Sequence, residues 1–409
     1  MAKIGVFIQK LWGGGTERVA VRLSHLWQES GHQVVLFTRT APTENDFAHQ
    51  CSQRIVYGEF SREQIVSTLT ENHIDICVYH DAWSDDEFAG IADSSRKCGA
   101  RMVFIHHHAF MNWAFFLCNV GDLFKMHLRD KIDALVCVNP IQALWFHHQG
   151  FKCFYIPNPL AFDEPKFVRR GSESSTLIWV GRPNDPGKQL DVAIEVFSRI
   201  KKKVSSARLL VVGEFRDPLR IGRLLQKKGL QDSVSLLGYC ADVRPYYEKA
   251  AVHLFTSVVE AAPMVLAELA AYGVPTVMLE LPMCWDATRD NGVVQIGNDD
   301  LDQMADECVR IVTDAVYAAS LSAGARNWFA SKRGVDVGAQ WQDLFEKRTG
   351  ACATLSVPCS YKTEKNYDIL LKEVVRAERF FITRYWRRLG LFMAMERRWL
   401  RIRRLFIDD

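Results

Sequence analysis

Short apolar runs alternate with helical patterns through most of this 409-residue chain. Ile4–Ile8 is apolar without alternation, as expected of a buried parallel strand, and a helical pattern separates it from the next strand at Val34–Phe37. This order predicts an α/β fold with parallel sheets covered by helices on both faces. The other strand-like runs are Ile74–Tyr79, Met102–Ile105, Ala134–Val138, Leu177–Val180, Leu209–Val212, Val234–Leu237 and Val252–Phe255.

The alternation occurs twice. Residues 161–175 are rich in Asp, Glu, Pro, Gly and Ser, a composition typical of a linker. The sequence therefore predicts two similar α/β domains, residues 1–160 and 176–347, followed by a helical, basic extension at residues 348–409.

Composition excludes several classes of protein. Hydrophobic residues make up 48% and charged residues 24%, an ordinary globular balance. Eleven cysteines without a CxxC pair argue against a zinc site or a disulfide framework and predict free thiols in a reducing, cytoplasmic compartment. The chain starts with a strand-like run rather than a signal peptide, and no apolar run reaches the roughly 18 residues of a membrane span.

The most informative segment is Thr256–Val277, which holds Glu260 and Glu268 with seven residues between them. Pro263 suits the first turn of a helix, and Tyr272-Gly273 ends it. Glu260 then lies just before the helix N-terminus, whose free N–H groups and partial positive charge suit a diphosphate. Carboxylates accept hydrogen bonds from sugar hydroxyls, so the segment predicts a nucleotide-sugar site. The alternative is a pair of solvated glutamates beside a buried helix.

Two further loops offer groups for phosphates. The first strand leads into a glycine turn, where Gly14 and Gly15 let the backbone approach a diphosphate closely. The loop after Leu177–Val180 carries Arg182 and Lys188, a planar fork and a point charge that together can clamp a leaving diphosphate. The alternatives are a tight turn required only by topology and cations that are merely solvated.

Histidines also follow predicted strands. His80 follows Ile74–Tyr79, and His106, His107 and His108 follow Met102–Ile105. Neighbouring side chains of an extended segment point to opposite faces, so the triplet cannot easily reach one ion, and no metal site is predicted. Packed or solvated histidines are the alternative to a role in catalysis.

These motifs, in this order, resemble those of family 4 glycosyltransferases, the retaining enzymes with the GT-B fold. The resemblance covers about residues 3–347 and includes the Glu-x7-Glu pattern, the GG-x-E-R turn, the Gly-Arg…Lys loop and Ile156-Pro157-Asn158. Three positions depart from the family pattern, because Ala261, Pro159 and Gln189 stand where glycine is usual.

The resemblance implies two Rossmann-like domains facing across a cleft and transfer of a hexose-type sugar from a nucleoside diphosphate to an acceptor hydroxyl, without metal or resident cofactor. A UDP-sugar is the favoured donor. It implies that Glu268 binds the ribose hydroxyls and that His106 lies near the reacting carbon. It also assigns Glu260 with Ala261, Met264 and Val265 to the donor sugar, Arg182 and Lys188 to the diphosphate, Gly14 and Gly15 to the approach of the first domain, and Gly238 and Tyr239 to the border of the nucleobase.

The C-terminal extension carries a distinct charge. Residues 361–409 hold thirteen Lys or Arg against seven Asp or Glu, and an apolar stripe repeats every three or four residues. Residues 376–406 therefore predict an amphipathic helix on an anionic membrane surface, at the inner face of the plasma membrane. Packing on the body or on a second copy of the chain in an oligomer is the alternative. The body has no basic excess, so nucleic-acid binding is not expected.

The expected acceptor is a lipid-linked glycan or a polysaccharide of a bacterial surface pathway. Two other functions fit parts of the sequence. Glu260 and Glu268 could act as the paired carboxylates of a glycoside hydrolase. Alternatively, a GT-B-like protein without activity could bind a partner through its extension.

Overall fold

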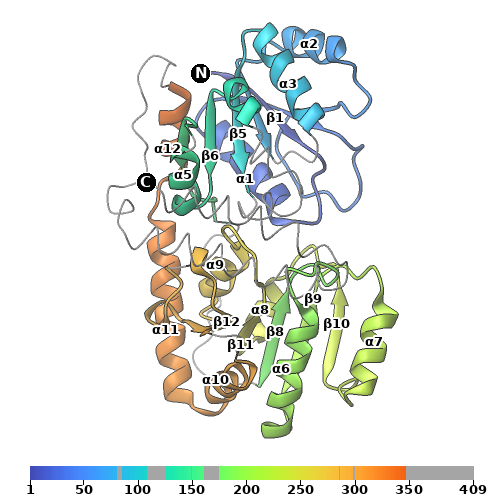
Figure 1. Ribbon diagram of the computed structural model, residues 1–409, viewed down its shortest axis with the longest axis vertical. Coiled ribbons are helices and arrows are strands. Elements are labelled where there is room, and N and C mark those ends of the chain that lie inside the picture. The colour runs from blue at the N-terminus through green and yellow to red at the C-terminus, as the bar shows by residue number, and fades with distance from the viewer. Residues whose placement is uncertain are drawn as a thin grey trace, which may run out of the picture.

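The computed structural model describes residues 1–80, 85–107, 126–148, 150–160, 175–284, 286–297 and 300–346. Two parallel sheets organise these residues, one in each of two α/β domains that lie one above the other in Figure 1. Residues 161–174 of the predicted linker and the extension 348–409, with the proposed membrane helix, lie outside the described residues, as do Asp81 and His108.

The first sheet has seven strands in the order β3-β2-β1-β4-β5-β6-β7, all paired in parallel. Its central strands are buried almost throughout, which explains their uninterrupted apolar sequences. The strands are β1 (Lys3–Ile8), β2 (Gln33–Thr38), β3 (Gln53–Val56), β4 (Ile76–His80), β5 (Arg101–His106), β6 (Ala134–Cys137) and β7 (Cys153–Tyr155).

Helices join these strands. The first of them starts directly after the glycine turn, and its buried face includes Val19, Leu23 and Trp27. The turn therefore places a helix N-terminus at the carboxyl end of β1, the edge where open α/β sheets bind ligands. The helices are α1 (Gly15–Glu29), α2 (Arg62–Glu71), α3 (Asp85–Lys97) and α5 (Pro140–His148), with a 3-10 segment η2 (Met126–Lys131).

The second sheet has six parallel strands in the order β10-β9-β8-β11-β12-β13. This is the strand order of a Rossmann domain. The strands are β8 (Thr176–Val180), β9 (Arg208–Val212), β10 (Val234–Gly238), β11 (Val252–Phe255), β12 (Thr276–Leu279) and β13 (Val293–Ile296).

The helices of the second domain show the predicted apolar stripes. In the helix after the cationic loop, Leu190, Ala193, Ile194 and Phe197 are buried. The helices are α6 (Leu190–Lys203), α7 (Pro218–Lys227), α8 (Arg244–Lys249), α9 (Met264–Ala271), α10 (Leu301–Thr313), α11 (Ala315–Arg333) and α12 (Val337–Glu346), with short 3-10 segments η3 (Pro282–Cys284) and η4 (Arg289–Asn291).

The last described helix returns to the first domain, as Figure 1 shows. The Trp341 ring of α12 meets the Trp27 ring edge-on at 5.1 Å, and Arg101 Nη1 donates to the carbonyl of Phe345 at 2.7 Å. Helix α12 lies within the range predicted for the second domain, 176–347, yet it packs on the first. The chain thus crosses between the domains a second time, which ties the two bodies together.

All the strand-like runs named from the sequence form strands, with ends shifted by at most two residues. Of the strands outside these runs, β12 begins at the end of the segment Thr256–Val277, and three others, β3, β7 and β13, were missed. Strand β3 is a partly polar edge strand of four residues, and β7 has only three, so neither gives a clear periodic signal. In the part of the chain that the structure describes, no helix combines the length and the apolar character that crossing a bilayer requires.

Candidate active site

The Glu-x7-Glu segment folds as its sequence predicts. Strand β11 ends at Phe255, a loop carries Glu260, and Pro263 is the N-cap of α9 with φ of −68°. Glu268 lies in the second turn of α9, and Gly273 follows the helix with a positive φ of 66°. The two carboxylates therefore flank a helix N-terminus.

Lys188 and Glu260 form an ion pair, in which Lys188 Nζ donates to Glu260 Oε1. Both side chains are largely buried, with 22% and 11% exposed. Two other bonds tie their loops together: Thr256 Oγ1 donates to the Lys188 carbonyl at 2.9 Å, and Val258 N donates to the Gly187 carbonyl at 2.9 Å. The loops after β8 and β11 thus form one unit at the carboxyl ends of adjacent strands.

Gln189 explains one departure from the family pattern. Its φ is +52° and its ψ is +52°, in the left-handed region that glycine adopts at least cost. The usual glycine at this position thus meets a backbone requirement of the turn that starts α6. In this chain Gln189 meets the same requirement with a side chain present.

Arg182 does not join the Lys188–Glu260 pair in this structure. Its guanidinium donates to Asp185 Oδ2 at 2.8 Å within its own loop, and its side chain is 61% exposed. The predicted diphosphate clamp therefore has one cation at the α9 loop and one that is exposed beside it. The role of Arg182 stays a prediction.

Glu268 is engaged through both of its oxygens. Arg18 Nη1, from the first turn of α1 in the other domain, donates to Oε1 at 2.8 Å. Tyr247 Oη, from α8, donates to Oε2 at 2.7 Å. Burial, and then the Glu268 carboxylate, raise the pKa of Tyr247 well above its ordinary value, so the hydroxyl keeps the proton that it donates. Sequence reasoning assigned no role to Arg18 or Tyr247.

The two helix N-termini approach each other across the domains. Met264 is the first residue of α9, and a Cβ added to Gly15 would lie 3.6 Å from its Sδ atom. Asn139, which follows β6, donates through Nδ2 to the carbonyls of Ala261 and Met283, both at 2.9 Å. We call these contacts, together with Arg18–Glu268, the interdomain seam. Asn139 is a second seam residue that the sequence did not reveal.

Gly238 and Tyr239 also lie near the first domain. Gly238 ends β10 with a φ of +73°, and Tyr239 Oη contacts the carbonyl of Asn45 at 3.5 Å. Partial burial raises the pKa of Tyr239. The turn predicted to border the nucleobase is therefore at the edge of the seam, although its role stays a prediction.

The histidines take two environments. His106 is fully buried at the end of β5, where its ring meets Phe146 edge-on at 5.1 Å. His107 is half-buried and shares a 3.0 Å hydrogen bond with His80 Nδ1. Burial lowers the pKa of His80 to about 3, so its imidazole is neutral. The catalytic role of His106 stays a prediction.

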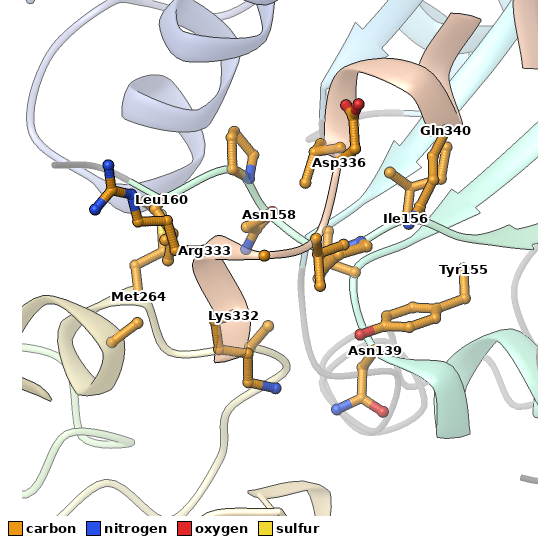
Figure 2. Close-up of a pocket in the computed structure, with 18 of the residues that line it drawn as sticks. Asn139, Tyr155, Ile156, Asn158, Leu160, Met264, Lys332, Arg333, Asp336 and Gln340 are labelled. Atoms are coloured by element: carbon orange, nitrogen blue, oxygen red, sulfur yellow. The ribbon is translucent and has the colours of Figure 1, made fainter. Parts of the chain in front are cut away.

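A large cavity of about 1360 Å³ lies where the chain crosses between the domains. Figure 2 shows its wall formed by the first crossing, with Tyr155, Ile156 and Asn158, and by the second, with Lys332 and Asp336. Of the residues predicted for the site, Ala261, Met264 and Glu268 line this cavity, whereas Arg182, Lys188 and Glu260 do not. The cavity therefore adjoins the predicted donor site at the α9 helix.

Within the described ranges, no group of three or more His, Cys, Asp or Glu side chains is placed to hold an ion. The cysteines of these ranges are free thiols.

Comparison with known families shows that residues 174–314 match the family described as Glycosyl transferases group 1. The chain carries a glycosyl transferases group 1 domain. The match covers most of the second domain, including Lys188, Glu260 and Glu268, and confirms the resemblance predicted from the sequence.

Two curated relatives extend beyond this domain. An exopolysaccharide phosphotransferase from Streptomyces coelicolor is 27% identical over 226 residues, which span 52% of this chain but only 23% of that protein. A phosphatidylinositol N-acetylglucosaminyltransferase protein of Arabidopsis thaliana is 25% identical over 333 residues, 74% of this chain and 71% of that protein. The match to the group 1 family and the similarity to the Arabidopsis protein indicate a glycosyltransferase.

The fold is that of known GT-B structures. TarM of Staphylococcus aureus, solved as a variant with fondaparinux, alpha-GlcNAc-glycerol and UDP, superimposes with a TM-score of 0.69 over 85% of this chain and 100% of that chain, at 14% identity. The predicted GT-B architecture is confirmed.

Proposed function

We propose that this protein is a retaining glycosyltransferase that moves a hexose-type sugar from a nucleoside diphosphate to an acceptor hydroxyl. The observation that carries the proposal is the Lys188–Glu260 pair, which lies before the N-terminus of α9. A cation, a sugar-binding carboxylate and free backbone N–H groups then meet at one place, facing the glycine turn of the other domain. Diphosphate and sugar hydroxyls are the ligands that this combination suits best.

The reaction proposed breaks the bond between the anomeric carbon and the diphosphate oxygen. The acceptor oxygen bonds to the same carbon on the same face, and its proton passes to the leaving phosphate. No protein base is required, so the chain contributes positioning and stabilisation of the charge that develops on the diphosphate.

Donor binding would change the partner of Lys188. In the structure, Lys188 neutralises Glu260. A donor diphosphate would compete for the ammonium, while sugar hydroxyls would donate to the released carboxylate. Arg182, exposed in the same loop, would supply the second cation. His106 would act near the reacting carbon, and Gly238 and Tyr239 beside the base.

The donor proposed is a UDP-sugar, and the acceptor a polysaccharide or a lipid-linked glycan. The UDP bound to TarM supports the nucleotide, and the names of the two relatives, one of an exopolysaccharide enzyme and one of a phosphatidylinositol enzyme, support these acceptors. We place the protein on the cytoplasmic side of the plasma membrane, with residues 376–406 on its surface. That basic sequence motivates this placement.

A donor-cleavage assay tests the proposal. Purified protein and Glu268→Ala are incubated with UDP-, GDP- and ADP-sugars and membrane extract, and nucleotide release and label in the lipid phase are measured. We expect release from one donor by the wild type only, and an α-linked product from an α-linked donor by NMR. An inverted product would refute the retaining mechanism.

The same assay decides the other functions. A glycoside hydrolase would release sugar without any nucleotide donor, yet here each carboxylate accepts from a cation instead of standing ready to donate a proton. A non-catalytic binding protein would bind a donor and never turn it over. No binding and no release with any donor would reject the transferase.

A further inference from the structure

Glu268 is held from both domains at once. Arg18 of the first domain donates a hydrogen bond to Oε1, and Tyr247 of the second domain donates one to Oε2. The Glu268 side chain is 8% exposed, and the Arg18 side chain is 26% exposed. Each contact fixes one oxygen, so the two together fix the plane of the carboxylate.

A fixed plane matters for recognising a ribose. A carboxylate has about four acceptor sites, of which Arg18 and Tyr247 occupy two. The remaining two can accept the 2′ and 3′ hydroxyls of a ribose, but only if the carboxylate is turned toward them. Side chains that are locked by such supporting bonds bind with better geometry than free ones.

Arg18 is itself held in place. It lies in the first turn of α1, directly after the glycine turn, and its guanidinium stands over the Phe47 ring at 5.2 Å. Because α1 belongs to the first domain, Arg18 can reach Glu268 only when the domains take the relative position seen here. The same closure brings Gly15 to Met264.

We infer that Arg18 is a positioning residue that couples recognition of the donor ribose to closure of the two domains. This inference rests on the proposed function, since it takes Glu268 as the ligand of the ribose. Closure of the domains then strengthens binding of the 2′ and 3′ hydroxyls of the ribose. By reciprocity, a nucleotide with both hydroxyls stabilises the closed arrangement by the same free energy.

Nucleotide binding tests the coupling directly. UDP, GDP and ADP, and the 2′-deoxy form of each, are titrated by calorimetry into the wild type, Arg18→Ala and Arg18→Lys. We expect the wild type to prefer the ribose form of its best nucleotide by roughly tenfold, as for a lost hydrogen bond to a charged group. In Arg18→Ala the ribose form should weaken by about tenfold and the preference should fall to about twofold. Arg18→Lys should recover part of it.

Control variants separate positioning from a general loss of structure. Arg22→Ala removes a cation one turn further along α1 and should leave the preference unchanged. Tyr247→Phe should lower the preference without opening the domains. Small-angle scattering of nucleotide-free protein should give a larger radius of gyration for Arg18→Ala than for the wild type and Arg22→Ala.

The possible failures are distinguishable. If the wild type binds none of the nucleotides, the proposed function falls and this inference with it. If the wild type binds one with a ribose preference that Arg18→Ala keeps in full, only this inference falls. An equal loss of both nucleotide forms in Arg18→Ala would likewise overturn it, since a purely structural role predicts that result.

Discussion

Lys188 and Glu260, 72 positions apart in sequence, form an ion pair at the N-terminal end of α9. Their loops follow adjacent strands, β8 and β11, and Thr256 bonds one loop to the other. The parallel sheet thus places a cation and an anion at its carboxyl edge before any ligand arrives. In the structure the ammonium and the carboxylate bind each other, and a donor would replace each as the other's partner. The pair is therefore the clearest target for mutation.

Lys188→Ala should lower the turnover number by about a hundredfold or more. Loss of one preorganised donor to a developing negative charge has effects of this size. Donor affinity should fall less, because the charge on the diphosphate grows during the reaction. The measurement is kcat and KM for nucleotide release from the preferred donor.

Lys228→Ala is the matched control for that experiment. Lys228 pairs with Glu195 and is 27% exposed, close to the 22% of Lys188, but lies at the end of α7. Its replacement should change kcat less than twofold. Equal activity in both variants would show that the Lys188–Glu260 pair has no part in catalysis.

Gln189→Gly should raise the free energy of unfolding by about 0.5 kcal/mol. A left-handed backbone destabilises a residue with a side chain by about 1 kcal/mol, and glycine removes this cost. The larger conformational entropy of glycine in the unfolded chain offsets part of the stabilisation. Urea denaturation of the wild type and the variant measures the difference.

His73→Gly provides a comparison for Gln189→Gly. His73, with φ of +50°, is the other non-glycine residue with positive φ within the described ranges. It follows α2, away from the loops of the site, and should give a similar gain in stability with unchanged activity. A loss of stability in Gln189→Gly would show that contacts of the glutamine side chain outweigh the backbone cost.

Much of each domain could be predicted from its local pattern. Apolar runs such as Ile4–Ile8 are buried in both sheets, and the Pro263 and Gly273 signals bound α9 to within a residue or two. The Glu-x7-Glu spacing also placed Glu268 in the second turn. These are properties of short segments, so the sequence carries them directly.

The seam between the domains could not be predicted in this way. Arg18 meets Glu268 across 250 positions, and Asn139 meets Ala261 across 122. Such pairs depend on the relative position of two separately folded bodies, which no local period encodes. Tyr247 belongs to a helix of only six residues, too short to show a pattern. The glycine turn before Arg18 was the one sequence feature that indicated where the first domain approaches the second.

Acidification should destabilise the protein below pH 6.5. Burial lowers the pKa of His80 and of His253 from 6.5 to about 3, so both stay neutral in the folded state while the unfolded chain takes up protons. Stability is therefore complete above pH 6.5 and is lost as the pH falls from 6.5 toward 3. Each residue should contribute a slope of about 1.4 kcal/mol per pH unit once the unfolded form is protonated.

His253→Gln tests this assignment. The free energy of unfolding is measured by urea denaturation between pH 7 and pH 5 for the variant and the wild type. The slope at the acid end should decrease by about 1.4 kcal/mol per pH unit, whatever the variant's stability at pH 7. Parallel curves would mean that His253 is not kept neutral by burial.

The space between Gly15 and Met264 should determine how well the donor binds. Side chains of increasing size at position 15 should therefore raise the donor KM. A Cβ at Gly15 would lie 3.6 Å from Met264 Sδ, an ordinary van der Waals contact, so Gly15→Ala should fold normally and raise the donor KM about twofold at most. The branched side chain of Gly15→Val would enter the space between α1 and α9, where we place the diphosphate. Its donor KM should therefore rise by about tenfold or more, since a displaced reactant loses its aligned contacts.

Donor kinetics of the two variants measure this change, and thermal unfolding shows whether both are folded. A donor KM in Gly15→Val equal to that of Gly15→Ala, with both folded, would mean that the diphosphate binds away from the glycine turn.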